Sequence, residues 1–116
     1  MRTFRDLKVY QKSFNLVMTI YSITKNLPKE ERYVLMTQIR RAAMSIPLNI
    51  AEGYGKSESK SEYKRFLSIA KGSCNEMQVL VDLLKALKYI DEKLHMELSN
   101  SYDEIGKMLY GLMKTL

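Results

Sequence analysis

Apolar residues recur along this chain at the three- and four-residue spacing of an amphipathic helix, in four successive segments. The first segment predicts a helix over residues 4–25, and Thr3 with Asp6 matches a capping box at its start. Its predicted core stripe contains Phe4, Leu7, Tyr10, Phe14, Val17 and Tyr21, widened by Leu16, Ile20 and Ile23.

The second segment is predicted to begin at Pro28, because the missing N–H of proline costs nothing in the first turn of a helix. It is predicted to end at Gly53 and Gly55, since glycine is the usual residue just beyond a helix. Its core stripe contains Leu35, Ile39, Ala42, Ile46 and Ile50. Pro47 falls inside this stripe without changing its phase, which predicts a kinked but continuous helix.

A loop is expected over residues 56–60, and Ser59 with Glu62 matches a capping box that opens the third helix. The core positions of the third helix are Tyr63, Phe66, Ala70, Cys74, Met77, Val81 and Leu84, with Leu67, Leu80, Leu83 and Leu87 beside them. Asp91 caps the fourth helix, which carries Leu94, Leu98, Ile105, Leu109 and Leu112. Short loops between four long helices predict an all-α, antiparallel up-down-up-down four-helix bundle, in one domain over residues 1–116.

Composition places the chain among ordinary globular proteins, with 46% hydrophobic and 28% charged residues. The single cysteine excludes an internal disulfide, so we expect a cytoplasmic protein. The longest uncharged run, residues 13–24, is shorter than the ~20 residues that a membrane-spanning helix needs. No membrane association is therefore expected.

Positive charge is concentrated in the first two thirds of the chain. The net charge is +6, and residues 1–75 hold 14 basic and 6 acidic side chains against 5 and 7 in the remainder. This imbalance indicates an anionic partner, with nucleic acid preferred over a membrane surface, unless the charge serves only solubility. The candidate nucleic-acid-binding residues are Arg40, Lys56, Lys60, Lys64 and Lys71, followed by the N-terminal stripe Arg5, Lys8 and Lys12.

Two polar series accompany the apolar stripes of the middle helices. They consist of Arg41, Ser45, Asn49 and Glu52 on the second helix and Arg65, Ser68, Gly72 and Glu76 on the third. One antiparallel register pairs Arg41 with Glu76, Ser45 with Gly72, Asn49 with Ser68 and Glu52 with Arg65. We predict ion pairs at both ends of this polar seam and a close helix approach in its middle, which would fix the register. The alternative is a binding or catalytic cleft built on Arg41, Asn49 and Glu52.

Catalytic and metal-binding motifs are sparse in this sequence. Glu92 and His95 form one Glu-x-x-His unit, whereas di-iron bundles need two and His95 is the single histidine. Cys74 is interpreted as a buried inert thiol, and His95 as a surface residue. Residues 53–57 lack the glycine spacing of a phosphate loop. We therefore expect no enzyme activity, no metal site and no cofactor.

The most distinctive run is Gln38-Ile39-Arg40-Arg41-Ala42-Ala43-Met44-Ser45-Ile46-Pro47-Leu48-Asn49-Ile50-Ala51-Glu52-Gly53. With Phe4-x-x-Leu7-x-Val9-Tyr10-Gln11, Phe66-Leu67-x-x-Ala70-x-Gly72-Ser73-x-x-Glu76 and Leu87-x-Tyr89-Ile90, it resembles the four-helix bundle proteins encoded in intervening sequences of bacterial 23S rRNA genes. This resemblance implies a bacterial cytoplasmic bundle that assembles as a homopentamer.

A more distant relative of that family, the accessory protein of diversity-generating retroelements, is a pentameric barrel that works with a reverse transcriptase and nucleic acid. By this analogy of fold, the first hypothesis is a non-enzymatic oligomer that binds RNA or DNA through phosphate contacts. The second hypothesis is a scaffold that docks a partner protein and has no direct role with nucleic acid.

Overall fold

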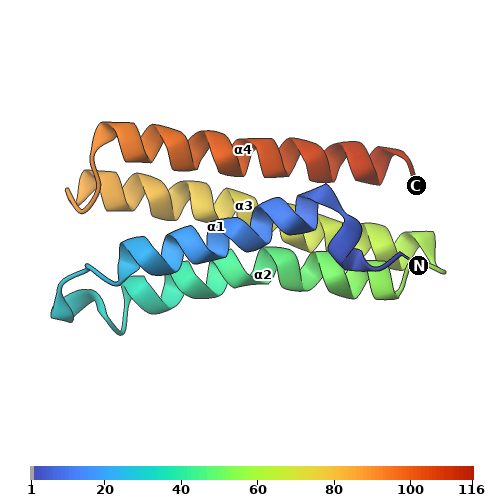
Figure 1. Ribbon diagram of the computed structural model, residues 1–116, viewed down its shortest axis with the longest axis horizontal. Helices are drawn as coiled ribbons and strands as arrows, with labels where there is room; N and C mark the ends of the chain where they lie inside the picture. Colours follow the sequence, from blue (N-terminus) through green and yellow to red (C-terminus); the bar gives the residue numbers. More distant parts are fainter. Residues whose placement is uncertain (1) are drawn as a thin grey trace.

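The computed structural model describes residues 2–116, and four long helices run side by side in it (Figure 1). The elements are the 3-10 turn η1 (Phe4–Asp6), α1 (Lys8–Thr24), the 3-10 turn η2 (Lys29–Glu31), α2 (Leu35–Gly55), α3 (Lys60–Ala86) and α4 (Glu92–Lys114). Successive helices are antiparallel, and both chain ends lie beside the α2–α3 turn (Figure 1). The bundle measures 45 × 23 × 23 Å. The predicted all-α up-down-up-down architecture is confirmed; residue 1 of the predicted domain lies outside the described residues.

The core of the bundle contains most of the apolar stripes predicted for α2, α3 and α4. Its fully buried side chains include Ile39, Ile46, Ile50, Leu67, Met77, Leu84, Ile105 and Leu109. The predicted α3 members Leu83 and Leu87 are exposed instead, and Phe66 is half-buried, because their side of α3 is not fully covered by a neighbouring helix within residues 2–116. Helix α2 continues through Pro47 and ends at Gly55, as predicted. Asp91 caps α4 by accepting a 2.8 Å hydrogen bond from the Leu94 N–H. None of the helices formed by residues 2–116 is long and apolar enough to cross a membrane.

The first predicted helix begins later than the sequence indicates. The capping box forms, since the Asp6 carboxylate accepts from the Thr3 N–H at 2.8 Å and the Thr3 hydroxyl accepts from the Arg5 N–H at 3.1 Å. However, it opens only the short turn η1, because Leu7 is extended at φ −73° and ψ 126°. Helix α1 therefore begins at Lys8, and the predicted start at residue 4 is wrong.

The prediction that the second helix begins at Pro28 is also wrong. Pro28 is extended, and it precedes η2 rather than α2, which begins at Leu35. A tertiary contact holds this segment, since the Tyr89 hydroxyl donates a 2.8 Å hydrogen bond to the Glu31 carboxylate. Tyr89 follows α3, so the loop before α2 is tied to a distant turn that local sequence does not encode.

Helix α1 turns a different face to the core than its aromatic stripe predicts. The buried residues of α1 are Val9, Ser13, Ile20 and Thr24. Two members of the predicted stripe, Phe14 and Tyr21, are 47% and 36% exposed. Ser13 and Thr24 can be buried because their hydroxyls donate to the carbonyls of Tyr10 and Ile20. The aromatic stripe is instead left on the outer side of the α1–α2 pair.

Candidate nucleic-acid interface

Three lysines gather at the end of the bundle where α2 turns into α3. Ser59 caps α3 by accepting from the Glu62 N–H at 3.3 Å, and this places Lys60 in the first turn, one turn before Lys64. Lys56 precedes them in the turn, and all three side chains are exposed. In the part of the chain that the structure describes, none of the three lies within ion-pair distance of a carboxylate. We call Lys56, Lys60 and Lys64 the basic end.

One acidic residue beside this cluster, Glu62, is already engaged. Both carboxylate oxygens of Glu62 accept from the Arg65 guanidinium, at 2.9 and 3.3 Å. This hydrogen bonding holds the pKa of the Glu62 carboxyl below its usual value. The charges of Glu62 and Arg65 therefore cancel locally, whereas the exposed Glu58 of the same turn offsets part of the charge of the three lysines.

Arg40 does not belong to this surface. Its Nε donates to the Thr24 hydroxyl at 2.8 Å, and its guanidinium lies 4.2 Å from the centroid of the Tyr21 ring. Arg40 thus joins α2 to α1 through part of its guanidinium, and its assignment as a phosphate-binding residue stays a prediction.

The other sequence-predicted cations divide between exposed and engaged positions. Lys71 lies on α3 and is half-buried, two turns beyond Lys64. In the N-terminal stripe, Lys8 is exposed, whereas Lys12 forms a 3.0 Å ion pair with Glu104 of α4. The Arg5 guanidinium lies 4.5 Å from the Phe4 ring centroid. This stripe is therefore partly used in packing the N-terminal segment.

The polar seam between α2 and α3 forms at one end and in its middle. Arg41 donates to Glu76 at 3.0 Å, which is the predicted pair. The Ser45 hydroxyl is hydrogen-bonded to the hydroxyl of Ser73, at 2.6 Å, rather than lying against Gly72. Gly72 is exposed, and a Cβ placed there would meet nothing within 4 Å. Its predicted role in a close helix approach is wrong, because it lies one residue away from the contact.

The predicted ion pair between Glu52 and Arg65 is wrong. Arg65 pairs with Glu62 one turn earlier on its own helix, because an i,i+3 partner is always within reach. Asn49 likewise donates to the carbonyl of Ser45 on its own helix, at 2.7 Å. Ser68 is exposed and, within residues 2–116, has no side-chain hydrogen bond. The seam thus holds α2 and α3 together through two contacts rather than four.

Helices α2 and α3 approach each other closely at Gly53, which the sequence pattern predicts only to end the second helix. A Cβ on Gly53 would lie 3.0 Å from the Cβ of Phe66 and 3.2 Å from Cδ1 of Tyr63. These distances are shorter than ordinary van der Waals contacts, so a methyl group there would require Phe66 or Tyr63 to shift. The absence of a side chain at Gly53 therefore lets α2 and α3 approach closely near the basic end.

Side chains with catalytic or metal-binding potential are few in this bundle. Cys74 is buried, and burial raises the pKa of its thiol to about 12, which keeps it protonated and unreactive. His95 is half-buried rather than on the surface, and its Nε2 lies 2.8 Å from the Asp82 carboxylate. Among residues 2–116 no group of three or more candidate ligands is arranged to hold a metal ion.

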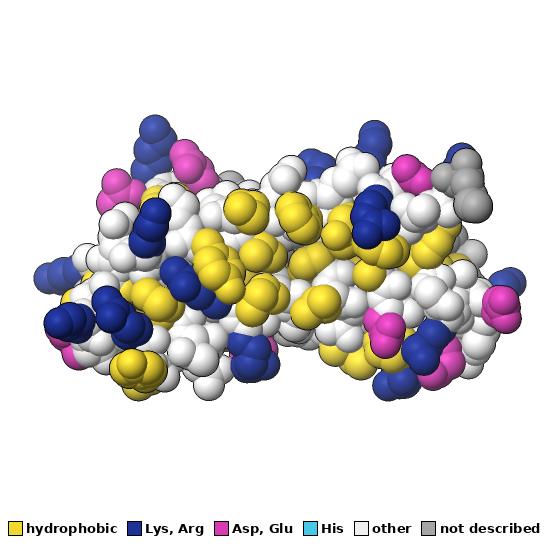
Figure 2. Space-filling model, turned by 60° about the horizontal axis from the view of Figure 1, so that its bottom comes forward, with side chains coloured by type: hydrophobic (Ala, Val, Ile, Leu, Met, Phe, Trp, Pro, Cys, Tyr) yellow, Lys and Arg dark blue, Asp and Glu magenta, His cyan; other side chains and the backbone are white. Residues whose placement is uncertain are grey.

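An apolar groove of about 270 Å³ lies between α1 and α2. It is lined by Phe4, Tyr10, Phe14, Val17, Met44, Pro47, Leu48 and Ala51. Figure 2 shows hydrophobic side chains gathered across this face of the molecule, with lysines and arginines around them. Leu48 is 66% exposed. The sequence pattern did identify part of this groove. Four of the lining residues, Phe4, Tyr10, Phe14 and Val17, belong to the apolar stripe that was predicted to face the core.

Comparison with known proteins decides the family. The family model described as 23S rRNA-intervening sequence protein matches residues 5–111. This chain belongs to the 23S rRNA-intervening sequence protein family. Its resemblance to that family, drawn from the sequence motifs, is thereby confirmed.

A solved relative supports the same assignment. A protein of unknown function from the S23 ribosomal protein family of Bacteroides thetaiotaomicron VPI-5482, solved at 1.70 Å, is 30% identical to this 23S rRNA-intervening sequence family member. The match covers 91% of this chain and 95% of that chain, with a TM-score of 0.82. None of the curated proteins compared with this chain matches it.

Proposed function

We propose that this chain is a non-enzymatic, self-associating bundle that binds RNA or DNA through phosphate contacts at its basic end. The observation that carries the proposal is the exposure of Lys56, Lys60 and Lys64 without carboxylate partners in residues 2–116. Lysines held on a rigid helix and capped turn form a patch of positive potential that attracts a phosphate backbone. Such contacts position a nucleic acid without reading its sequence. The cytoplasm is the compartment that this proposal assigns.

Self-association is the second part of the proposal. The α1–α2 groove is one apolar surface, and α3 carries another, formed by Val79, Leu83 and Leu87, which are 59%, 42% and 49% exposed. Because the two surfaces consist of different residues, contact between them in successive copies is heterologous. Heterologous contacts form a ring when the rotation between copies closes, and the proposal is that it closes here. A homopentamer is the ring size that the family resemblance favours. Each added copy would repeat the basic end and strengthen binding through multivalency.

Fluorescence anisotropy with a labelled structured RNA and a DNA duplex, across a salt series, tests the nucleic-acid part. The double variant Lys60→Glu with Lys64→Glu should weaken binding at least tenfold and flatten the slope of log affinity against log salt. The matched control is Lys25→Glu with Lys93→Glu, which reverses two exposed lysines near the opposite end of the bundle. Equal affinity of the two double variants would contradict the assignment to the basic end.

A protein-interaction scaffold is the alternative, favoured by the exposed apolar groove between α1 and α2. Light scattering of the wild type and of Leu48→Glu separates it from self-association. If the groove joins copies of this chain, the wild type is an oligomer and the variant has a lower mass. A monomeric wild type that binds no nucleic acid at low salt would contradict the proposal and leave the groove to a different protein.

A further inference from the structure

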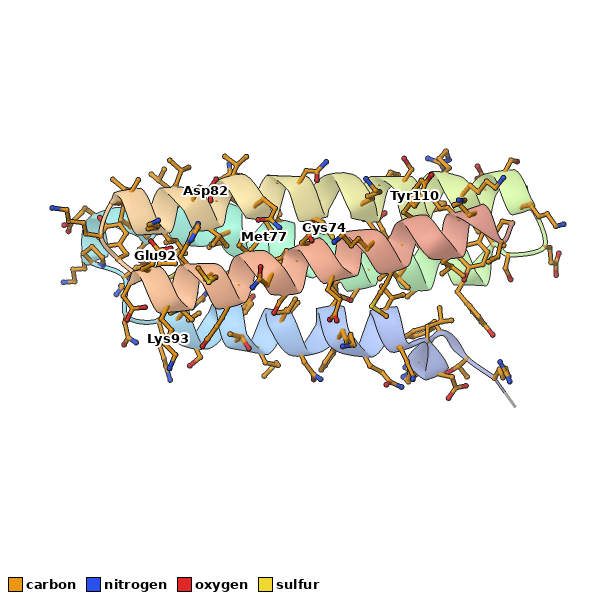
Figure 3. The ribbon with its side chains drawn as sticks, turned by 90° about the horizontal axis from the view of Figure 1, so that it is seen from above. Cys74, Met77, Asp82, Glu92, Lys93 and Tyr110 are labelled. Carbon is orange, nitrogen blue, oxygen red and sulfur yellow. The ribbon has the colours of Figure 1, made fainter. Side chains whose placement is uncertain are left out.

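A polar groove of about 530 Å³ lies between α3 and α4, outside the surfaces described above. The register of the two helices is set by Gln78 with Ser99 and by Asp82 with His95, which places Lys71 opposite Gly106. The groove is lined by Lys71, Cys74, Asn75, Gln78, Ser99, Asn100, Tyr102, Asp103, Gly106, Lys107 and Tyr110. Figure 3 shows this side of the bundle, with Cys74 and Tyr110 labelled where α3 and α4 meet. Its volume is within the usual range for sites that hold small organic groups, about 300–1,000 Å³.

Several polar groups of this groove have no partner in the chain. The Tyr102 side chain is 1% exposed, and its buried hydroxyl makes no hydrogen bond within residues 2–116. Unpaired buried hydroxyls are rare because they forgo the hydrogen bonds of water. The side-chain amides of Asn75 and Asn100 are exposed and likewise lack partners among the described residues. These groups offer hydrogen bonds that a ligand can complete.

Hydrogen bonds join the two walls of the groove near one end, and a glycine keeps its middle open. Gln78 donates to the carbonyl of Ser99 at 2.8 Å and accepts from its hydroxyl at 2.7 Å, which joins the two walls. A Cβ on Gly106 would meet nothing within 4 Å. Glycine is unfavourable inside a helix, and packing within this chain does not require it at this position. Because Gly106 has no side chain, the space opposite Lys71 stays open.

Cations and an exposed aromatic ring surround that space. Lys71 is half-buried and, within the described chain, has no carboxylate partner. Lys107 is bonded to Asp103 at 3.1 Å in an exposed i,i+4 pair, which balances the one negative charge in the lining. Tyr110 is 54% exposed, and the Lys114 ammonium lies 5.4 Å from its ring centroid. Amines beside an aromatic ring and free amides are the groups with which proteins hold an unpaired nucleotide.

We infer that this groove holds one unpaired nucleotide of a single-stranded nucleic acid. Its base lies against the Tyr110 ring and its phosphate contacts Lys71. Lys60, Lys64 and Lys71 share one face of α3, so the strand leads from the basic end into the groove. A duplex cannot bind in this way, because its bases are paired and stacked. The inference rests on the proposed binding of nucleic acid and adds the site and the kind of strand.

The decisive experiment fills the groove without changing its charge. The variant is Gly106→Leu, and the matched control is Gly111→Leu on the same helix, where a Cβ also meets nothing within 4 Å. Both are titrated by anisotropy into a labelled 12-nucleotide single-stranded RNA and into an RNA duplex of equal length. Gly106→Leu should lose at least tenfold in affinity for the single strand and keep its affinity for the duplex. Gly111→Leu should match the wild type with both probes.

The outcomes separate this inference from the proposed function. If wild type and Gly106→Leu bind the single strand equally, the groove is not the site, although the basic end can still bind nucleic acid. If the wild type binds neither probe at low salt, the proposed function itself fails. Circular dichroism and thermal melting establish that both leucine variants are folded before either result is accepted.

A second pair of variants tests the base contact. Tyr110→Phe keeps the ring and should preserve single-strand affinity, whereas Tyr110→Ala should lose about tenfold. Equal loss in both variants would overturn stacking on Tyr110. Competition with a free nucleoside monophosphate identifies the source of the nucleotide. A monophosphate that binds as tightly as the 12-nucleotide strand would overturn the assignment to a strand.

Discussion

Ser45 of α2 and Ser73 of α3 are hydrogen-bonded through their hydroxyls, with an Oγ–Oγ distance of 2.6 Å. Ser45 also bonds the carbonyl of Ala42 at 2.7 Å, and Ser73 is 8% exposed. A polar contact between two helices otherwise joined by apolar packing favours one register of α2 against α3. This pair, with Arg41 and Glu76 one turn away on each helix, therefore aligns the two helices that carry the basic end.

The first prediction concerns this serine pair. Ser73→Ala should lower the free energy of unfolding by about 0.5–1.5 kcal/mol, because one buried hydrogen bond is lost while Ser45 keeps its bond to Ala42. Urea denaturation monitored by circular dichroism measures the change. Ser68→Ala on the same helix is the control, since Ser68 is exposed. Equal stability of the two variants would show that the hydroxyl pair contributes nothing.

The second prediction contrasts two glycines. Gly53→Ala should destabilise the bundle by about 1–3 kcal/mol, because the new methyl group would lie 3.0 Å from Phe66. Gly72→Ala should stabilise it by about 0.5–1 kcal/mol, because its Cβ meets nothing and alanine favours a helix. Thermal melting of the two variants tests the opposite signs. Two shifts of the same sign would contradict the packing described at Gly53.

The third prediction concerns Cys74 at alkaline pH. Its folded-state pKa is raised by burial from 9.0 to about 12, so the unfolded state releases the proton first. The protonated Cys74 thiol therefore contributes its full share to the free energy of unfolding below pH 9. That contribution is lost as the pH rises towards 12, and the free energy of unfolding falls by up to about 1.4 kcal/mol per pH unit. Urea midpoints of the wild type and Cys74→Ala between pH 8 and 11 should therefore converge. A constant difference between them would mean that the thiol is not protected by the fold.

The fourth prediction uses the backbone of the α3–α4 turn. Lys88 has a φ of 66°, in the left-handed region that favours glycine. Lys88→Gly should raise the free energy of unfolding by about 1 kcal/mol, since it removes this steric cost at the end of α3. Calorimetric melting compares it with Lys85→Gly inside α3, which should be destabilising. A lower melting temperature for Lys88→Gly would contradict the prediction.

The sequence by itself determined the presence of four helices, the caps of α3 and α4 and most of the core, because these depend on contacts three or four residues apart. Ser59 and Asp91 cap α3 and α4 as predicted, and the stripe from Leu35 to Ile50 is buried. The membership of Lys60 and Lys64 in one exposed face of α3 is equally local. These features need only the helical repeat to be predicted.

The tertiary structure decided which ion-pair partner a charged side chain contacts and which face of a helix is buried. The sequence left Arg65 two acidic candidates, Glu52 and Glu62, and the structure shows that Glu62 on its own helix is its partner. Phe14 and Ser13 lie next to each other on α1, yet the serine is buried and the phenylalanine is 47% exposed. Periodicity measures how apolar a face is, whereas its burial depends on the shape of the neighbouring helices. The groove between α3 and α4 arises from that same interhelical packing, so no local pattern in the sequence could have predicted it.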